Sequence, residues 1–239
     1  MAFRFKKFIV EDDRSTMRIG TDAMIMGAWA NPGKAATILD IGTGCGVLAL
    51  MMAQKSDAVI HAIDIHKNSV HQSSVNFSNS PWSERLTSFH SSFSDYVKTA
   101  GIRFDLIITN PPFFRNSLQS PSKKRNLARH GDDETLTSLI ESVNQLLTEQ
   151  GEFYIILPAG GVKFATDHAS LVGLHVIERL NIRSKPEKQI HRVILRFGKS
   201  RTHEVVSNEL VIRNADNSYS KDYISLTTDF HFGNESLRH

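Results

Sequence analysis

Apolar residues along the chain form short runs that alternate with longer segments. The runs lie at residues 37–41, 59–63, 86–90, 104–109 and 151–157, and most are rich in the β-branched and aromatic side chains typical of strands. Residues 47–54 and 67–77 fit helices between them, and residues 135–147 place apolar side chains at helical spacing. Because this alternation is typical of parallel βαβ units, we expect an α/β fold with a doubly wound, Rossmann-like, mostly parallel sheet.

The two ends of the chain depart from this pattern. Strand-like runs at residues 176–182, 191–197 and 205–212 follow one another without helices, which predicts antiparallel C-terminal edge strands on the same sheet. Residues 1–35 form a preamble that closes with the turn sequence Asn31-Pro32-Gly33. Since no repeat or linker marks a boundary, we expect a single domain over residues 1–239, with an extension at 1–35 and an α/β core at 36–239.

Composition excludes several classes of protein. A chain of 239 residues with 40% apolar and 22% charged residues is typical of one ordinary globular domain. No apolar run approaches the roughly 20 residues needed to cross a bilayer, and the charged N-terminus does not resemble a signal peptide. The single cysteine, Cys45, permits no internal disulfide and no zinc cluster. We therefore expect a cytoplasmic protein without metal or membrane partners, and we take a monomer as the simplest state.

Charge adds a more local hint. The 28 basic and 25 acidic residues leave a net charge of only +3, which by itself does not indicate a nucleic-acid partner. A basic cluster lies after residue 113 and consists of Lys123, Lys124, Arg125 and Arg129. It could bind phosphates, although such clusters are also common on solvated surfaces.

A glycine-rich loop joins the run at 37–41 to the helix expected at 47–54. Its sequence is Asp40-Ile-Gly42-Thr-Gly44-Cys-Gly46. Glycines allow positive φ angles and a close approach of ligand to backbone, and the free N–H groups of a helix N-terminus favour a negative group such as a carboxylate. A dinucleotide fingerprint would need glycine where Val47 stands, and no Gly-Lys-Ser/Thr ending marks a P-loop. The loop therefore predicts a different ligand.

A second motif, the tetrad Asn110-Pro111-Pro112-Phe113, follows the run at 104–109. Two prolines stiffen the loop and leave carbonyl groups free, and Asn110 adds a side-chain acceptor. Phe113 offers a flat apolar surface. This combination suits a planar substrate that carries an NH₂ group, since two acceptors can take its hydrogens while a ring stacks on its face.

The D-x-G-x-G-x-G loop resembles motif I of the class I S-adenosylmethionine-dependent methyltransferases. The resemblance implies that the loop, with Gly42, Gly44 and Gly46, wraps the methionine part of S-adenosylmethionine and that Asp40 lies near its amino group. Asp64, which ends the next run 24 residues later, has the spacing expected for a ribose-binding acid. Ile65 beside it, and then Ser92 and Phe93 after the run at 86–90, are the candidates for the adenine pocket. Asn110 is expected at the cofactor as well as at the substrate.

Flanking segments resemble one family, the tRNA1(Val) adenosine-37 N6-methyltransferases, over nearly the whole chain. The matching segments are Phe5-Lys-Lys-Phe8, Met17-Arg-Ile-Gly20-Thr-Asp22, Met26-Gly-Ala-Trp29, residues 48–53, Asn79-Ser-Pro-Trp82, Ala128-Arg-His130 and residues 219–232. The resemblance implies methylation of the exocyclic amine of the adenosine next to the anticodon, with the basic cluster on the loop backbone. It also implies that Thr21 and Asp22 lie over the cofactor pocket, although both residues also suit a helix cap.

The expected chemistry needs no strong base. Acceptors at Asn110 and Pro111 would favour a pyramidal nitrogen with its lone pair aimed at an activated methyl donor, and the methylated nitrogen then becomes acidic. His130 is open as a base, a structural group or a phosphate contact. Two alternative functions are a glutamine N-methyltransferase that modifies a release factor and a non-catalytic RNA-binding protein on the same fold.

Overall fold

The computed structural model describes residues 2–15, 18–111, 124–201 and 204–231, with side chains for all of these except residues 124–134. Its centre is an eight-stranded sheet with the order β10-β8-β9-β7-β6-β3-β4-β5. The strands are β3 (Thr37–Ile41), β4 (Val59–Asp64), β5 (Leu86–His90), β6 (Phe104–Thr109), β7 (Leu147–Pro158), β8 (His175–Arg183), β9 (Arg192–Gly198) and β10 (Val206–Val211). The expected α/β fold is confirmed.

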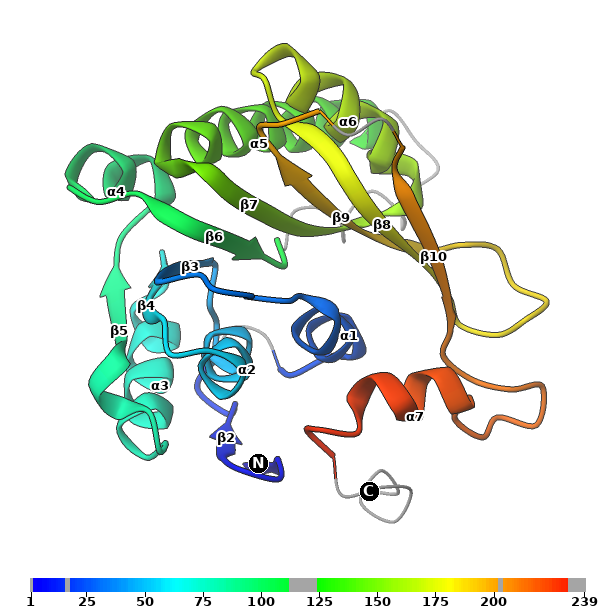
Figure 1. Cartoon of the computed structure of the whole chain (residues 1–239), viewed down its shortest axis with the longest axis horizontal. Coiled ribbons are helices and arrows are strands. Elements are labelled where there is room, and N and C mark those ends of the chain that lie inside the picture. The colour runs from blue at the N-terminus through cyan, green and yellow to red at the C-terminus, as the bar shows by residue number, and fades with distance from the viewer. Residues whose placement is uncertain (1, 16–17, 112–123, 202–203, 232–239) are drawn as a thin grey trace.

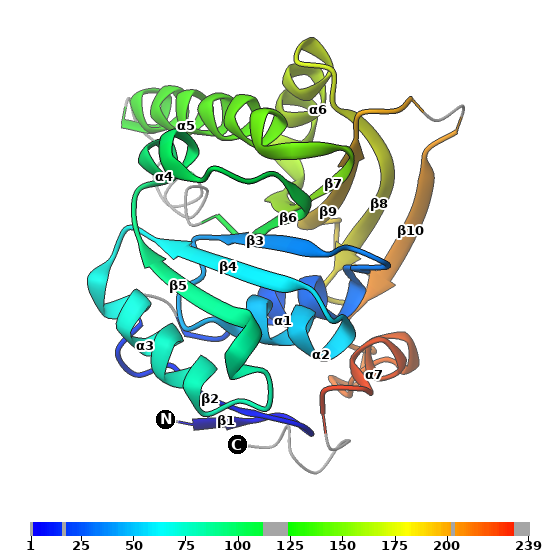
Figure 2. The ribbon, with the colours of Figure 1, turned by 60° about the vertical axis from the view of Figure 1, so that its left-hand side comes forward.

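Helices cover both faces of the sheet, as Figures 1 and 2 show. One layer contains α1 (Thr21–Trp29), α2 (Val47–Lys55), α3 (Lys67–Ser78) and α7 (Lys221–Thr227), and the other contains α4 (Phe93–Thr99), α5 (Lys124–Leu146) and α6 (Val162–Leu171). A separate buried apolar cluster fills the space on each side. Because both faces are covered, central strands such as β6 are almost continuously apolar.

The N-terminal preamble packs against α3 near the glycine-rich loop. It contains a hairpin of β1 (Ala2–Arg4) and β2 (Ile9–Glu11), in which Phe5 stacks on Phe8 at 4.2 Å between ring centroids. The side chain of Asn76 on α3 accepts a hydrogen bond from the N–H of Glu11 and donates to the carbonyls of Glu11 and Cys45. One buried amide thus ties the hairpin, α3 and the glycine-rich loop together.

The direction of the C-terminal strands corrects the sequence-based expectation. β9 is antiparallel to both β7 and β8, as expected for this part of the chain. The edge strand β10 instead runs parallel to β8, because the chain reverses after β9 and returns on the far side of β8. β10 therefore ends at the same edge of the sheet as β3, β4 and β6, which places the segment after it next to the ends of those strands.

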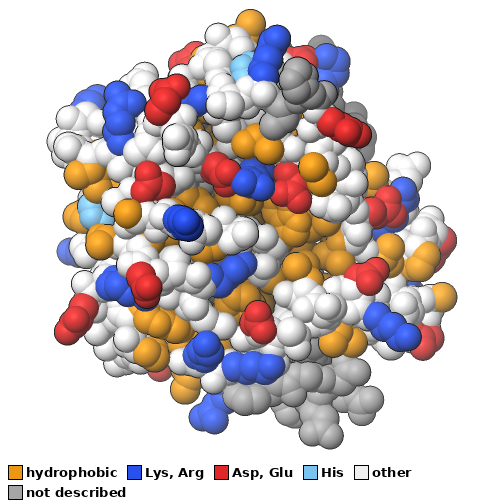
Figure 3. All heavy atoms as spheres, in the orientation of Figure 1, with side chains coloured by type: hydrophobic (Ala, Val, Ile, Leu, Met, Phe, Trp, Pro, Cys, Tyr) orange, Lys and Arg blue, Asp and Glu red, His pale blue; other side chains and the backbone are white. Residues whose placement is uncertain are grey.

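One face of the surface shows no strong segregation of charge. On the face drawn in Figure 3, acidic and basic side chains are interspersed, and apolar side chains gather in a hollow beside them. Across the part of the chain that the structure describes, no helix combines the length and hydropathy that a bilayer crossing requires.

Candidate active site

A cavity of about 780 Å³ lies at the carboxyl ends of the parallel strands. Its wall includes residues that follow β3, β4, β5 and β6, together with the start of α1. In open α/β sheets this edge is where ligands bind. The site is therefore built from the loops that the sequence motifs occupy.

The glycine-rich loop forms the floor of the cavity in a left-handed backbone conformation. Gly42, Gly44 and Gly46 have φ angles of 71°, 58° and 86°. A Cβ on Gly42 would meet open space, whereas one on Gly46 would lie 2.5 Å from the ring of Phe77 on α3. Gly42 thus allows a ligand to approach the backbone, and Gly46 allows α2 to begin against α3.

Asp40 lies beneath this loop and is fully buried. Its Oδ2 atom accepts hydrogen bonds from the Thr43 hydroxyl at 2.6 Å and from the N–H of Ala49 at 3.2 Å, whereas Oδ1 has no partner within the described part of the chain. Burial raises the pKa of Asp40 to about 7. Residues 41–45 form the cavity wall above it, so Asp40 acts on the site by shaping the loop. Its expected closeness to a methionine amino group stays a prediction.

Asp64, at the end of β4, connects the two neighbouring loops. Its carboxylate accepts hydrogen bonds from the N–H of Gly44 at 2.9 Å and from the N–H of His66 at 2.8 Å. The side chain of Ile65 beside it is 62% exposed and borders the cavity. The expected pair of an acid and an apolar residue is therefore present at the cavity wall.

Ser92 and Phe93 border the same end of the cavity. The Ser92 hydroxyl caps α4, because it accepts from the N–H of Asp95 at 3.2 Å and donates to the Asp95 carboxylate at 2.7 Å. Phe93 begins the helix and is half-buried. The expected adenine pocket thus has an apolar ring, while its hydroxyl is already engaged in the helix cap.

Asn110 and Pro111 leave β6 at the centre of the cavity wall. Their position is fixed because β6 pairs with β3, and the Thr109 hydroxyl donates to the carbonyl of Ile41 at 2.8 Å. The Asn110 side chain makes no hydrogen bond with any residue that the structure describes. Asn110 thus borders the cavity together with residues of the glycine-rich loop.

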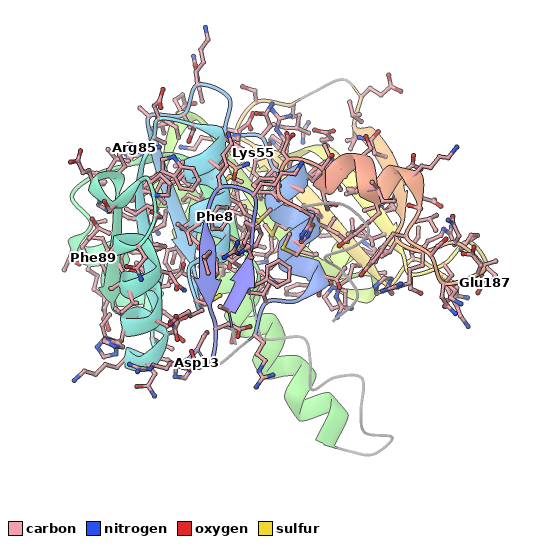
Figure 4. The ribbon with its side chains drawn as sticks, turned by 90° about the horizontal axis from the view of Figure 1, so that it is seen from below. Phe8, Asp13, Lys55, Arg85, Phe89 and Glu187 are labelled. Carbon is pink, nitrogen blue, oxygen red and sulfur yellow. The ribbon has the colours of Figure 1, made fainter. Side chains whose placement is uncertain are left out.

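The structure describes only some of the remaining tetrad and basic residues. Pro112, Phe113 and Lys123 lie outside the described residues. Lys124, Arg125, Arg129 and His130 belong to the first turns of α5, whose side chains are not described. Figure 4 shows this end of α5 projecting beyond the neighbouring elements.

Thr21 and Asp22 border the cavity from the first turn of α1. The N-cap of this helix is Gly20, so the alternative of a helix-capping role for either side chain is wrong. Asp22 instead forms an ion pair of 3.0 Å with Arg192, which begins β9. This pair joins the first turn of α1 to the start of β9.

Sequence reasoning missed one wall of the cavity, which consists of Arg18, Ser184, His191, Arg213 and Tyr219. These residues come from separate loops before α1, around β8 and β9, and after β10. Two signals were available, because Arg18 lies in the segment Met17–Asp22 and Tyr219 begins the segment at 219–232, both of which carry the family resemblance. Over the described residues, no group of His, Cys, Asp and Glu side chains forms a candidate metal site.

Comparison with known proteins agrees with this geometry. The family model described as the methyltransferase small domain matches residues 15–160. The tRNA1(Val) (adenine(37)-N6)-methyltransferase of Phocaeicola vulgatus is 40% identical over 229 residues, which cover 96% of this chain and 97% of the relative. The protein of the same name from Proteus mirabilis is 36% identical over 234 residues, which cover 96% of this chain and 93% of the relative.

Solved structures show the same fold at low sequence identity. A predicted O-methyltransferase from Agrobacterium tumefaciens superposes with a TM-score of 0.67 at 16% identity and covers 87% of this chain and 96% of its own. The ribosomal protein L11 methylase of Lactobacillus delbrueckii gives a TM-score of 0.54 at 18% identity and covers 76% of this chain and 78% of its own. Together with the sequence matches, these findings show that the chain belongs to the methyltransferase small domain family and, within it, to the tRNA1(Val) (adenine(37)-N6)-methyltransferases.

Proposed function

We propose that the chain transfers a methyl group from S-adenosylmethionine to the N6 amine of adenosine 37 in tRNA1(Val). The observation that carries this proposal is that one cavity brings the glycine-rich loop, Asp64 and Asn110-Pro111 together. A donor site and an amine-orienting site thus share one wall. The names of the full-length relatives supply the identity of the nucleotide.

The chemistry of the donor half fits S-adenosylmethionine. The open space above Gly42 and the N–H groups at the start of α2 suit the carboxylate of the methionine part. Asp64 provides carboxylate oxygens for ribose hydroxyls, and Ile65 and Phe93 provide apolar surface for adenine. When bound, the cofactor supplies a methyl group on a positively charged sulfur, which is already activated for transfer.

The protein's contribution to transfer is the orientation of the acceptor amine. The side-chain oxygen of Asn110 and the carbonyl of Pro111 would accept the two N6 hydrogens. These hydrogen bonds draw the lone pair out of conjugation with the ring and direct it toward the methyl group. Positioning of this kind accounts for a large part of the rate when the donor is already activated.

Proton removal needs no dedicated base. The two carboxylates that border the cavity in the described structure are already engaged, Asp22 with Arg192 and Asp64 with two backbone N–H groups. After transfer, the positively charged nitrogen is acidic and loses its proton to water. The site therefore acts through positioning and electrostatics.

The proposed substrate is the anticodon loop of a cytoplasmic tRNA, bound by a single copy of this chain. A loop base is partly unstacked, so extruding it into the cavity costs less than flipping a base from a duplex. The preamble at residues 1–35 contributes Arg18 and Thr21 to the cavity wall, which supports its assignment as an extension over the site of a single domain. The cluster Lys123, Lys124, Arg125 and Arg129 would contact the RNA backbone.

The decisive experiment is methyl transfer from labelled S-adenosylmethionine to bulk tRNA that lacks this modification, followed by digestion to nucleosides. We expect N6-methyladenosine in one tRNA species, at the position next to the anticodon. Transfer to a release factor that persists after ribonuclease treatment would support a glutamine methyltransferase instead. Binding of tRNA without transfer to either acceptor would indicate a non-catalytic RNA-binding protein.

A further inference from the structure

The cavity also has a wall outside the glycine-rich loop and the Asn110–Phe113 tetrad. This wall is formed by Arg18, Ser184, His191, Arg213 and Tyr219. Arg213 reaches it because β10 runs parallel to β8 and so ends at the edge of the sheet where the cavity lies. Asn110 and Pro111 border the same cavity.

Arg213 is held in place by its own loop. Its guanidinium carbon lies 4.1 Å from the centroid of the Tyr219 ring, and its Nη1 atom donates to the carbonyl of Asn217 at 2.7 Å. The backbones of Arg213 and Tyr219 form a bridge, and the ring of Tyr219 stacks on that of Tyr223 at 4.7 Å. The plane of the guanidinium is therefore set before any ligand binds.

The charge of Arg213 is not neutralised by a carboxylate within the described part of the chain. Two other arginines at the ends of neighbouring strands are paired, Arg192 with Asp22 and Arg183 with Glu209. Arg213 has no carboxylate within ion-pair distance among the described residues, and its one hydrogen bond goes to a neutral carbonyl. A fixed, unpaired guanidinium on a cavity wall is suited to bind a phosphate with two parallel hydrogen bonds.

We propose that Arg213, oriented by Tyr219, binds the phosphate next to the target adenosine and so positions the RNA strand at the cavity. This inference rests on the proposed function, because it assumes that the base entering the cavity belongs to an RNA chain. A base that reaches Asn110 brings its flanking phosphates to the mouth of the cavity. Arg213 then neutralises one of these phosphates. The ring of Tyr219 holds the guanidinium of Arg213 in the orientation that lets its N–H groups point at the phosphate.

The test compares Arg213→Ala, Arg213→Lys and Tyr219→Leu with Arg103→Ala. Arg103 is an exposed arginine just before β6, at the end of the strand that lies away from the cavity. Its removal changes the net charge as much as removal of Arg213 does. The measurements are the dissociation constant of an unmodified tRNA transcript at several salt concentrations and the affinity for S-adenosylmethionine by calorimetry.

We expect Arg213→Ala to weaken tRNA binding about tenfold and to lower the slope of log affinity against log salt by about one. Arg213→Lys should keep most of the slope but lose several-fold in affinity, because an ammonium keeps the charge without the planar fork. Tyr219→Leu should lose affinity and keep the slope. Arg103→Ala should stay close to wild type, and all four variants should bind S-adenosylmethionine normally.

Equal behaviour of Arg213→Ala and Arg103→Ala would overturn the proposal, whether both lose affinity or neither does. If Arg213→Ala also lost cofactor binding, the salt slopes of tRNA binding in Arg213→Lys and Tyr219→Leu would test the proposal instead. A lowered slope in Arg213→Lys would contradict a phosphate contact. The proposed function is tested separately by the wild-type protein. Absence of N6-methyladenosine from its tRNA product would reject that function even where Arg213 affected RNA binding.

Discussion

Two aspartates near the cofactor loop have different chemistry because their surroundings differ. Asp64 lies at the wall of the cavity and accepts hydrogen bonds from two backbone N–H groups. Asp40 is fully buried, and the loss of solvent raises its pKa to about 7 despite two hydrogen bonds to the same oxygen. One acid is therefore ready to bind hydroxyl groups, while the other titrates near neutral pH.

The pKa of Asp40 predicts a specific pH dependence of stability. A pKa raised from 3.8 to about 7 means that the folded state holds the proton more tightly, so stability is lost as pH rises through this window. Relative to Asp40→Asn, which does not titrate, the wild type should lose about 2–3 kcal/mol of unfolding free energy between pH 5 and pH 8. Urea denaturation of the cofactor-free proteins at both pH values measures this. If the difference in unfolding free energy between the two proteins were the same at pH 5 and pH 8, the raised pKa of Asp40 would be contradicted.

Asn110 is expected to act on the substrate rather than on the fold. Asn110→Ala should lower the rate of methyl transfer by about 10²–10³-fold, because the acceptor amine loses an orienting oxygen. The affinity for S-adenosylmethionine should fall much less than the rate, since the main role proposed for Asn110 is to orient the acceptor amine. Asn110→Asp keeps an acceptor oxygen and should retain more activity than Asn110→Ala. Rate assays together with calorimetry test this division, and an equal loss of cofactor affinity would contradict it.

Among the elements, those buried on both faces were the most predictable from sequence. β3 and β6 occupy the expected residues, because a short apolar run between turn residues has few alternatives in a covered sheet. α4 was missed because it is short and only one of its residues, Tyr96, is buried. The Ser92-x-x-Asp95 spacing of a capping box was its available signal.

The candidate site likewise contains parts that the sequence predicts and one part that it does not. The glycine-rich loop and Asp64 are local features of a strand end, so a single sequence is enough to place them at one edge of the sheet. The wall with Arg213 and Tyr219 depends on the path of the last strands, because a parallel β10 places Arg213 at the cavity. A run of strand-like residues contains no information about the direction in which an edge strand pairs, which is why this wall was not predicted.

Gly46 shows how the start of an element depends on one residue. Its φ is 86°, and a Cβ added to it would lie only 2.5 Å from the Phe77 ring, which leaves no room for alanine. Gly46→Ala should lower the unfolding free energy by about 2–4 kcal/mol, since left-handed strain and overpacking add. Gly33→Ala is the control, because Gly33 has a φ of 53° but open space around it, so it should cost only the strain of about 1–2 kcal/mol. Equal losses in urea denaturation would show that the contact with Phe77 is unimportant.

At the scale of the whole molecule, we expect RNA binding to depend on where positive charge is left unpaired. The net charge is only +3, and the face in Figure 3 shows interspersed charges, so no broad basic surface accounts for affinity there. Arg213 lies on one wall of the cavity. Pro111 borders the same cavity just after β6, and α5 is the next described element along the chain. Lys124, Arg125 and Arg129 belong to the first turns of α5, at the end of the helix that projects in Figure 4.

Charge reversal of Lys123, Lys124 and Arg125 to Glu tests whether this second group contacts RNA. The triple variant should weaken tRNA binding by at least about 100-fold and lower the salt slope by about two to three, because up to three phosphate contacts are replaced by repulsion. Combined with Arg213→Ala, the losses should be nearly additive in free energy if the two groups bind separate phosphates. Reversal of three exposed lysines elsewhere, Lys34, Lys98 and Lys163, changes the net charge equally and is the control. An equal loss in this control, or an unchanged slope in the triple variant, would show that the start of α5 is only a solvated surface.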